Sequence, residues 1–237
     1  VLKKSMPASA HNPIRIKVCG ITTPEQAEAC IDLGANMIGI NCWKPSPRYV
    51  DPEKLAVIVH AIAGRVETVA LFVNENPLQV NRLMEQYPLD TAQLHGDETP
   101  DYTRELKFPW FKAFRVNDDF QPSLIVQYGQ TRFLLDAYSK NRYGGTGRTF
   151  DWEIAIHAKQ QGKLMLAGGL TPDNAAEAVK RVQPDALDVC SGVESQPGIK
   201  DLEAVKRFIQ NARGANRETP GIMMDHPEHE PLSRPTS

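Results

Sequence analysis

The sequence predicts an α/β fold, a single-domain (β/α)8 barrel, and three observations support that prediction. The chain has 237 residues, which suits one barrel of about 250 residues. Short apolar runs alternate with helix-length segments along it. Six Xaa-Pro pairs stand where helices are expected to begin, and neighbouring pairs between Pro24 and Pro122 are spaced by one strand, one loop and one helix.

The proline pairs predict the starts of the helices. They are Thr23-Pro24, Asp51-Pro52, Asn76-Pro77, Thr99-Pro100, Gln121-Pro122 and Thr171-Pro172. A Ser, Thr, Asp or Asn side chain accepts a hydrogen bond from a free N–H of the first turn, and proline at the first position sacrifices no bond. Gln121 is a poor capping residue, so its pair is weaker evidence. Amphipathic helices are expected at residues 24–33, 52–62, 77–86, 152–161, 173–182 and 202–212.

Eight strands are expected before or between these helices. They cover residues 14–19, 37–42, 68–73, 91–94, 110–116, 133–136, 164–167 and 186–189. Most are continuous apolar runs, which is typical of parallel strands buried on both faces. Eight strand–helix units with right-handed connections favour a closed barrel, with an open doubly wound sheet as the alternative.

Composition and charge indicate how the chain divides into domains and which classes of partner it binds. We predict an N-terminal extension at residues 1–13, the barrel at 14–213 and a disordered, proline-containing tail at 214–237. A formal net charge of −2 favours neither nucleic acid nor a membrane as partner, and residues 1–13 lack the apolar segment of a signal peptide. The four cysteines form no C-x-x-C pair, so we expect reduced thiols, no metal and a cytoplasmic location.

In a barrel, the reacting groups lie where strands run into the loops that follow them. Cys19 ends the first strand beside a glycine and near a helix N-terminus. A lowered thiol pKa there would suit a base or a nucleophile. The simpler alternative is that Cys19 is a small buried hydrophobic residue. Arg48 follows the second strand in a proline-stiffened loop, and its guanidinium suits a carboxylate or phosphate, although a solvated surface arginine is equally compatible. His95 follows the fourth strand and favours a structural or supporting role.

Asp136 ends the sixth strand directly after apolar residues, where an acid is costly unless it is paired or functional. Partial burial would raise its pKa and suit it to general-acid work. The glycine-rich loop that follows, at residues 144–147, lacks the ending of a nucleotide-binding P-loop.

Small residues follow the last two strands, at Gly168 and Gly169 and at Ser191 and Gly192. They allow backbone N–H groups to approach an anion, and the loops after strands seven and eight are the recurring phosphate site of such barrels. The sequence therefore indicates a phosphorylated small-molecule substrate.

Seven strings together resemble the phosphoribosylanthranilate isomerase family. They are KVCGIT at 17–22, SPRYV at 46–50, QLHGDE at 93–98, Leu135-Asp136, GGTGRTFDW at 144–152, AGGLTPDN at 167–174, and DVCSGVES at 188–195 with PGIKD at 197–201. They occur in family order across nearly all of the expected barrel. One departure lies ahead of Arg48, where this chain reads INCWKP at 40–45.

The resemblance implies a TIM barrel that performs an Amadori rearrangement of phosphoribosylanthranilate in tryptophan biosynthesis. It implies Asp136 as general acid, Cys19 as general base, and Arg48 as the group that binds the anthranilate carboxylate. It places Asp188 near the ribose and His95 beside the substrate. Backbone groups of Gly168, Gly169, Ser191 and Gly192, together with Gly145, are expected at the phosphate. No cofactor is implied, and the assembly is a monomer or a homodimer.

Two other functions remain as alternatives. A histidine-pathway isomerase performs the same rearrangement on an aminoimidazole substrate, but its acid and base are both aspartates, which Cys19 disfavours; a dual-substrate enzyme is a further variant. A non-catalytic barrel used as a binding module is difficult to reconcile with Cys19, Asp136 and two anion loops in one chain.

Overall fold

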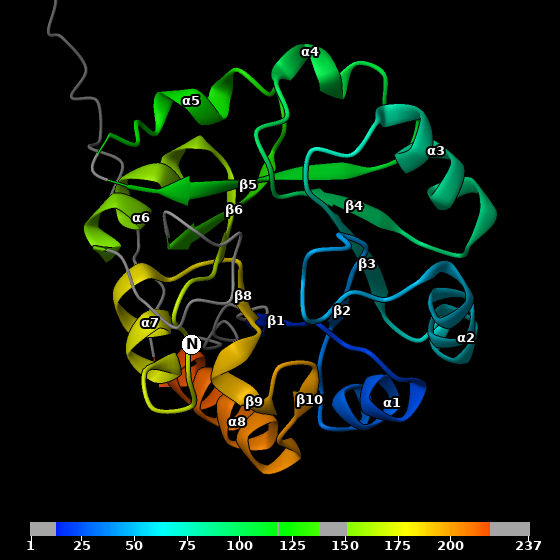
Figure 1. The fold of residues 1–237 in the computed structure, drawn as a ribbon. Coiled ribbons are helices and arrows are strands. Elements are labelled where there is room, and N and C mark those ends of the chain that lie inside the picture. Colours follow the sequence, from blue (N-terminus) through cyan, green and yellow to red (C-terminus); the bar gives the residue numbers. More distant parts are fainter. Residues whose placement is uncertain (1–12, 118, 138–150, 219–237) are drawn as a thin grey trace, which may run out of the picture.

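A computed structural model describes residues 13–117, 119–137 and 151–218. Its eight parallel strands form a closed barrel with the helices outside (Figure 1). The strands are β1 (Arg15–Cys19), β2 (Met37–Asn41), β3 (Glu67–Phe72), β4 (Thr91–Leu94), β5 (Trp110–Val116), β6 (Arg132–Ala137), β7 (Lys163–Leu166) and β8 (Ala186–Val189). Each end lies within one residue of its predicted position.

The barrel is closed by pairing between β1 and β8. The two strands run parallel with Val18 beside Val189, and β2 to β7 follow in chain order between them. The predicted barrel is therefore confirmed, and the open doubly wound alternative is wrong.

Helices connect most of these strands on the outer surface. They are α1 (Pro24–Asp32), α2 (Pro52–Ile62), α3 (Pro77–Gln86), α4 (Pro100–Thr103), α5 (Ser123–Val126), α6 (Trp152–Ala158), α7 (Ala175–Val182) and α8 (Leu202–Glu218), with 3₁₀ turns η1 (Lys159–Gln161) and η2 (Ser191–Val193). Within residues 13–117, 119–137 and 151–218, no helix combines the length and apolar character needed to cross a membrane.

Four of the six proline pairs begin helices as predicted. The side chains of Thr23, Asp51, Asn76 and Thr99 accept hydrogen bonds from first-turn N–H groups of α1, α2, α3 and α4. Each cap fixes the direction in which its helix leaves the loop.

Three boundaries differ from the prediction. Pro122 precedes α5 and provides no side-chain cap. Pro172 lies outside α7, because the Asn174 amide oxygen accepts from Thr171 N and holds a turn before the helix begins. Helix α8 continues to Glu218, beyond the predicted barrel boundary at 213. The predicted extension at 1–12 and tail at 219–237 lie outside the described residues.

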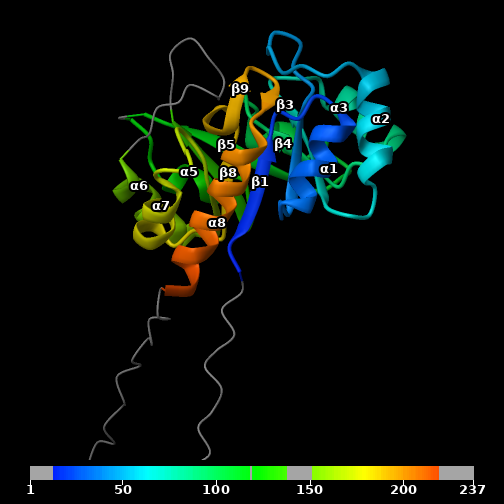
Figure 2. The ribbon, with the colours of Figure 1, turned by 90° about the horizontal axis from the view of Figure 1, so that it is seen from below.

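A short antiparallel hairpin follows β8, and the sequence patterns did not predict it. It consists of β9 (Glu194–Gln196) and β10 (Ile199–Lys200), with Gly198 between them at φ = +83°. Figure 2 places β9 at the upper end of the barrel, opposite the amino-terminal end of β1. The hairpin thus lies at the end where the strands finish.

The core is divided by the barrel wall. A large cluster fills the space between strands and helices, and a smaller one lies inside the barrel. The inner cluster comprises Met37, Val69, Phe111, Ala113, Leu134, Met165, Ala167 and Ala186. Such filling is typical of small barrels, whose interior is a packed core and not a channel, so ligands are expected at the ends.

Glu67 ties four strands together at their amino-terminal ends. Its carboxylate lies 2.7 Å from both Arg15 Nη2 and Arg132 Nη1, and it accepts a hydrogen bond from Thr91 Oγ1 at 3.0 Å. These residues begin β3, β1, β6 and β4 respectively. Burial works to raise the pKa of Glu67, but the two arginines outweigh it and hold that pKa below 4.5.

We predict that Glu67→Gln lowers the free energy of unfolding by about 1–2 kcal/mol at neutral pH. A carboxylate with a depressed folded-state pKa stabilises the fold above its unfolded-state pKa, and this contribution disappears as the pH falls through the folded-state value. Urea unfolding at pH 7 and at about pH 3.5 measures the difference between wild type and variant. A difference of the same size at both pH values would contradict the assignment.

Candidate functional site

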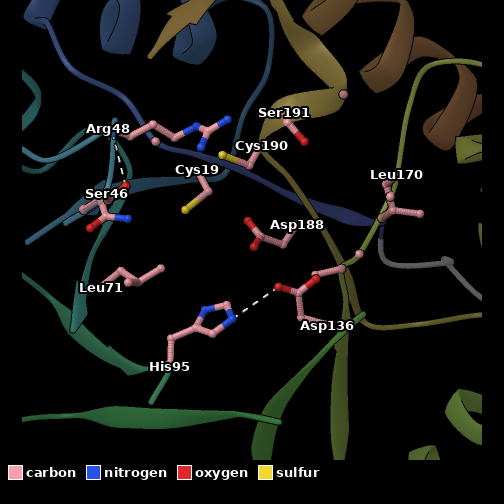
Figure 3. Close-up of a pocket in the computed structure, with 16 residues that line it drawn as sticks. Cys19, Ser46, Arg48, Leu71, His95, Asp136, Leu170, Asp188, Cys190 and Ser191 are labelled. Atoms are coloured by element: carbon pink, nitrogen blue, oxygen red, sulfur yellow. Dashed lines mark hydrogen bonds and ion pairs between the residues drawn. The ribbon is translucent and has the colours of Figure 1, made fainter. Parts of the chain in front are cut away.

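One pocket opens where the strands finish, and it brings together every described residue that the sequence singled out. Its lining includes Cys19, Arg48, His95, Asp136, Gly168, Gly169, Asp188, Ser191 and Gly192 (Figure 3). Asn41, Leu71, Leu170 and Cys190 complete much of the remaining wall. Gly145 lies outside the described residues.

The Cys19 thiol is surrounded by groups that favour its ionised form. The pKa of Cys19 lies well below its usual range, and a hydrogen bond from the Cys190 thiol is the largest cause. Burial works to raise this pKa, and the ammonium groups of Lys17 and Lys200 lower it further. The sequence pointed to a nearby helix N-terminus as a cause. Helix α1 begins at Pro24, and the groups that lower the pKa of Cys19 are side chains that the sequence did not single out.

Beneath Cys19, the barrel contains a buried ion pair. Lys17 Nζ lies 2.9 Å from Asp188 Oδ1, and the two side chains are 0% and 8% exposed. Burial works to lower the pKa of Lys17, but Asp188 and Cys19 outweigh it and raise that pKa, so the ammonium stays charged. Burial raises the pKa of Asp188 to about 6, against the influence of Lys17.

Gly39 on β2 provides the space for this arrangement. A Cβ atom at that position would lie 2.8 Å from Cys19 Sγ and 2.9 Å from Lys17 Nζ. Cys19 and Gly39 are register partners in neighbouring strands. Any larger residue at Gly39 would therefore displace the thiol or the ammonium.

Asp136 faces His95 across the pocket. Asp136 Oδ1 accepts a hydrogen bond from Ala137 N at 2.8 Å, and Oδ2 lies 3.2 Å from His95 Nε2, poorly aligned for a hydrogen bond. The Gln93 side-chain amide donates to His95 Nδ1 at 2.8 Å, which leaves the proton of a neutral ring on Nε2, facing the carboxyl group. Both side chains are almost fully buried.

Arg48 is held by a carboxylate of the protein itself. Its Nε lies 2.9 Å from Glu194 Oε1, and its Nη2 lies 2.5 Å from Oε2, so the contact is bidentate. Lys200 Nζ binds the same carboxylate at 2.7 Å. Burial works to raise the pKa of Glu194, but Arg48 and Lys200 outweigh it and lower that pKa. Hairpin β9–β10 thus fixes the arginine from the far side.

Two glycines in the last loops fit where no side chain would. A Cβ atom on Gly168, at φ = +85°, would lie 2.5 Å from Ala137 N and 3.0 Å from Asp136 Oδ1. One on Gly192 would lie 1.9 Å from Leu170 O. The loop after β7 therefore packs directly against Asp136 and against η2, whose first N–H groups lack partners within their own short helix.

Four residues of this arrangement were not predicted from the sequence: Lys17, Cys190, Glu194 and Lys200. All four lie inside strings quoted for the family resemblance, but their pairing depends on strand register and on the hairpin. A lysine inside an apolar strand was the one available signal for Lys17, because a buried charge requires a partner. Among the described residues, no group of three His, Cys, Asp or Glu side chains could hold a metal ion.

The chain matches one protein-family model over residues 16–211, and that model describes N-(5′-phosphoribosyl)anthranilate (PRA) isomerase. The N-(5′-phosphoribosyl)anthranilate isomerase of Trichlorobacter lovleyi is 49% identical over 203 residues, covering 85% of this chain and 99% of the relative.

Solved structures agree with this match. One contains mutually generated monomers of the dimeric phosphoribosylanthranilate isomerase from Thermotoga maritima. It superposes on this chain with a TM-score of 0.76 at 34% sequence identity, and the match covers 85% of this chain and 99% of that one. Another holds a phosphoribosyl anthranilate isomerase in complex with reduced 1-(o-carboxyphenylamino)-1-deoxyribulose 5-phosphate. Its TM-score is 0.76 at 33% sequence identity, and the match again covers 85% of this chain and 99% of that one.

We predict that Lys17→Met raises the pH at which Cys19 becomes reactive by at least about one unit, the scale for loss of a close opposite charge. Iodoacetamide labelling of the intact fold across a pH series, read at the Cys19 peptide by mass spectrometry, measures that midpoint. The double variant Lys17→Met/Asp188→Asn removes the ion pair without leaving a lone buried carboxylate. An unchanged midpoint in both folded variants would show that Lys17 does not support the thiolate.

Proposed function

Because the chain belongs to the N-(5′-phosphoribosyl)anthranilate isomerase family, we propose that Asp136 and Cys19 are the acid and base of its reaction. The protein is an isomerase of tryptophan biosynthesis, and the non-catalytic module considered above is wrong. The observation that supports the two roles best is that a thiol with a lowered pKa and a buried carboxyl group line one pocket from different strands.

The rearrangement begins with an acid. Asp136 donates a proton to the furanose ring oxygen, the bond between that oxygen and C1′ breaks, and an imine with the anthranilate nitrogen forms. His95 supports this role, since its Nε2–H faces Asp136 Oδ2 and favours one orientation of the carboxyl group. Gly168 supports it too, because a side chain there would contact Asp136 Oδ1.

The second step needs a base on the neighbouring carbon. The Cys19 thiolate removes the C2′ proton, the electron pair moves toward the imine nitrogen, and the resulting enamine becomes the ketone. The Cys190 thiol, Lys17 and Lys200 lower the pKa of Cys19, which favours the thiolate that a general base requires. The acid and base come from β6 and β1, which lets each have its own surroundings.

The remaining pocket residues are assigned to binding. Arg48 takes the anthranilate carboxylate: Glu194 occupies Nε and Nη2, and within the described part of the chain Nη1 has no partner. Gly168, Gly169, Ser191 and Gly192 hold the phosphate through backbone N–H groups, with Gly145 also assigned there. Asp188 lies beside the ribose. The ligand is a phosphosugar, as in the related complex.

The related structures do not fix the assembly, since the Thermotoga enzyme is described both as dimeric and as monomers. A monomer or homodimer, and a cytoplasmic location, remain predictions for this chain. So do the boundaries of its single catalytic domain at residues 14 and 213.

We predict that Cys19→Ala and Asp136→Asn each lower kcat by at least roughly 10²-fold, the scale for a positioned base or acid. Decay of the fluorescence of freshly generated phosphoribosylanthranilate measures the rate, with circular dichroism as the folding control. Full activity in either folded variant would overturn that residue's role. If wild type gives no decay above background, the aminoimidazole substrate of the histidine pathway is tested next.

We predict that Arg48→Ala raises KM about tenfold or more and changes kcat less, because its contact with the carboxylate is similar in ground and transition states. Steady-state kinetics with varied substrate separates the two constants. Arg48→Lys is the matched control, since it keeps the charge and loses the fork, and an intermediate KM is expected. An unchanged KM in Arg48→Ala would place the anthranilate carboxylate elsewhere.

A further inference from the structure

Two thiols lie together at the mouth of the barrel, one of them assigned above as the base. We propose that Cys19 and Cys190 are a redox modification site, joined by a reversible disulfide when the protein meets a hydroperoxide. The loss of activity that this disulfide causes rests on the proposed role of Cys19. The formation of the disulfide does not, because it depends only on the two thiols and their surroundings.

Strand register brings the two cysteines side by side. β1 and β8 pair in parallel, with Lys17 beside Asp188 and Val18 beside Val189. Cys19 is the next residue on β1, and Cys190 is the first residue after the end of β8. Neighbouring strands lie about 4.8 Å apart, and disulfides span Cα–Cα distances of about 4.4–6.8 Å, so the paired residues that precede the two cysteines hold the chains at a suitable spacing.

The two side chains also belong to one packed region. Cys190 packs against the small cluster of Cys19, Leu71 and Val73, and its thiol is the strongest hydrogen-bonding influence on Cys19. Gly20 keeps the space around them narrow, since a Cβ atom there would lie 3.0 Å from Cys190 Sγ. Figure 3 shows both sulfur atoms at the same side of the pocket, and both residues line it, so a small oxidant reaches them through the substrate entrance.

The charges around the pair favour oxidation at Cys19 first. A thiolate, not a thiol, attacks a peroxide, and Lys17 and Lys200 support that form at Cys19. The hydrogen bond to Cys19 and burial raise the pKa of Cys190, so it stays protonated while Cys19 is ionised. Lys200 Nζ lies 4.0 Å from Cys190 Sγ, and Glu194 Oε1 lies 3.9 Å from it.

The reaction has two balanced steps. The Cys19 thiolate attacks one oxygen of hydrogen peroxide, the O–O bond breaks, and sulfenic acid and hydroxide form. Cys190, its proton passing to the leaving hydroxyl, then attacks the Cys19 sulfur; the S–S bond forms and water leaves. The Lys200 ammonium, 4.0 Å from the Cys190 sulfur, works to lower the pKa of Cys190 and so favours this attack.

The other two cysteines provide the contrast. Burial raises the pKa of Cys30 to about 11 and that of Cys42 to about 12. Neither lies in the pocket lining. A bond to either of them would not follow from this geometry, and Cys42→Ala is a control outside the pair.

The experiment treats reduced wild type, Cys190→Ser and Cys42→Ala with hydrogen peroxide, alkylates free thiols, and maps the peptides by mass spectrometry. Digestion with trypsin and Glu-C separates Cys19 from Cys30, because Glu25 and Glu28 lie between them. Isomerase activity is followed before peroxide, after peroxide and after dithiothreitol. Cys190→Ala is a second variant in case the serine destabilises the loop.

In wild type and Cys42→Ala we expect a peptide that links Cys19 to Cys190, two hydrogen atoms lighter than the separate peptides, and activity that falls with it and returns with dithiothreitol. In Cys190→Ser we expect sulfinic acid at Cys19 and activity that dithiothreitol does not restore. Separate alkylated peptides in treated wild type, or full recovery of both Cys190 variants, would overturn the disulfide. A linked peptide without effect on an active enzyme would instead overturn the role of Cys19 as base.

Discussion

The buried ion pair between Lys17 and Asp188 is the interaction on which the rest of the pocket depends. It joins β1 to β8, the two strands that close the barrel, two residues before Cys19 at the end of β1 and two before Cys190, which follows β8. A buried pair of this kind is a weak source of net stability, because the desolvation of two charges offsets most of their attraction. Its value here is electrostatic: it places a permanent positive charge under the thiol, and the carboxylate prevents that charge from being lost to deprotonation.

The surroundings of Cys19 and Asp136, the proposed base and acid, then differ for a geometric reason. Cys19 lies on the side of the mouth that carries Lys17 and Lys200, whereas Asp136, on β6, faces a histidine whose proton position is set by Gln93. One side of the mouth carries positive charges that stabilise a thiolate, and the other is almost fully buried. The proposed acid and base work from opposite protonation states, and their places on different strands give each its own surroundings.

The sequence was sufficient for the barrel, because each strand–helix unit carries local signals: a continuous apolar run, a cap and a proline. It was also sufficient to select Cys19 and Asp136, which stand at strand ends, and Arg48, in the loop that follows β2. It did not predict that Arg48 is already held by Glu194, or that Lys200 is buried beside the same carboxylate. Those contacts depend on hairpin β9–β10, whose five strand residues have no alternating pattern. Likewise, Pro172 resembled a helix start, but the side chain of Asn174 delays α7.

Glycine explains how so many charged groups fit at one narrow end. Gly39 leaves room for Lys17 and Cys19, Gly20 for Arg48 and Cys190, and Gly168 for Asp136. Each of the three lies against a different functional side chain, so the lack of a side chain at these positions makes room for the charged groups of the pocket. The crowding also has a chemical consequence: a thiolate placed within contact of a second thiol, under positive charge and open to solvent through the pocket, combines the features that make cysteines oxidisable. The surroundings that suit Cys19 to its proposed role as base thus also favour its oxidation, and Cys190 is the neighbour that, in the proposed disulfide, makes the oxidation reversible.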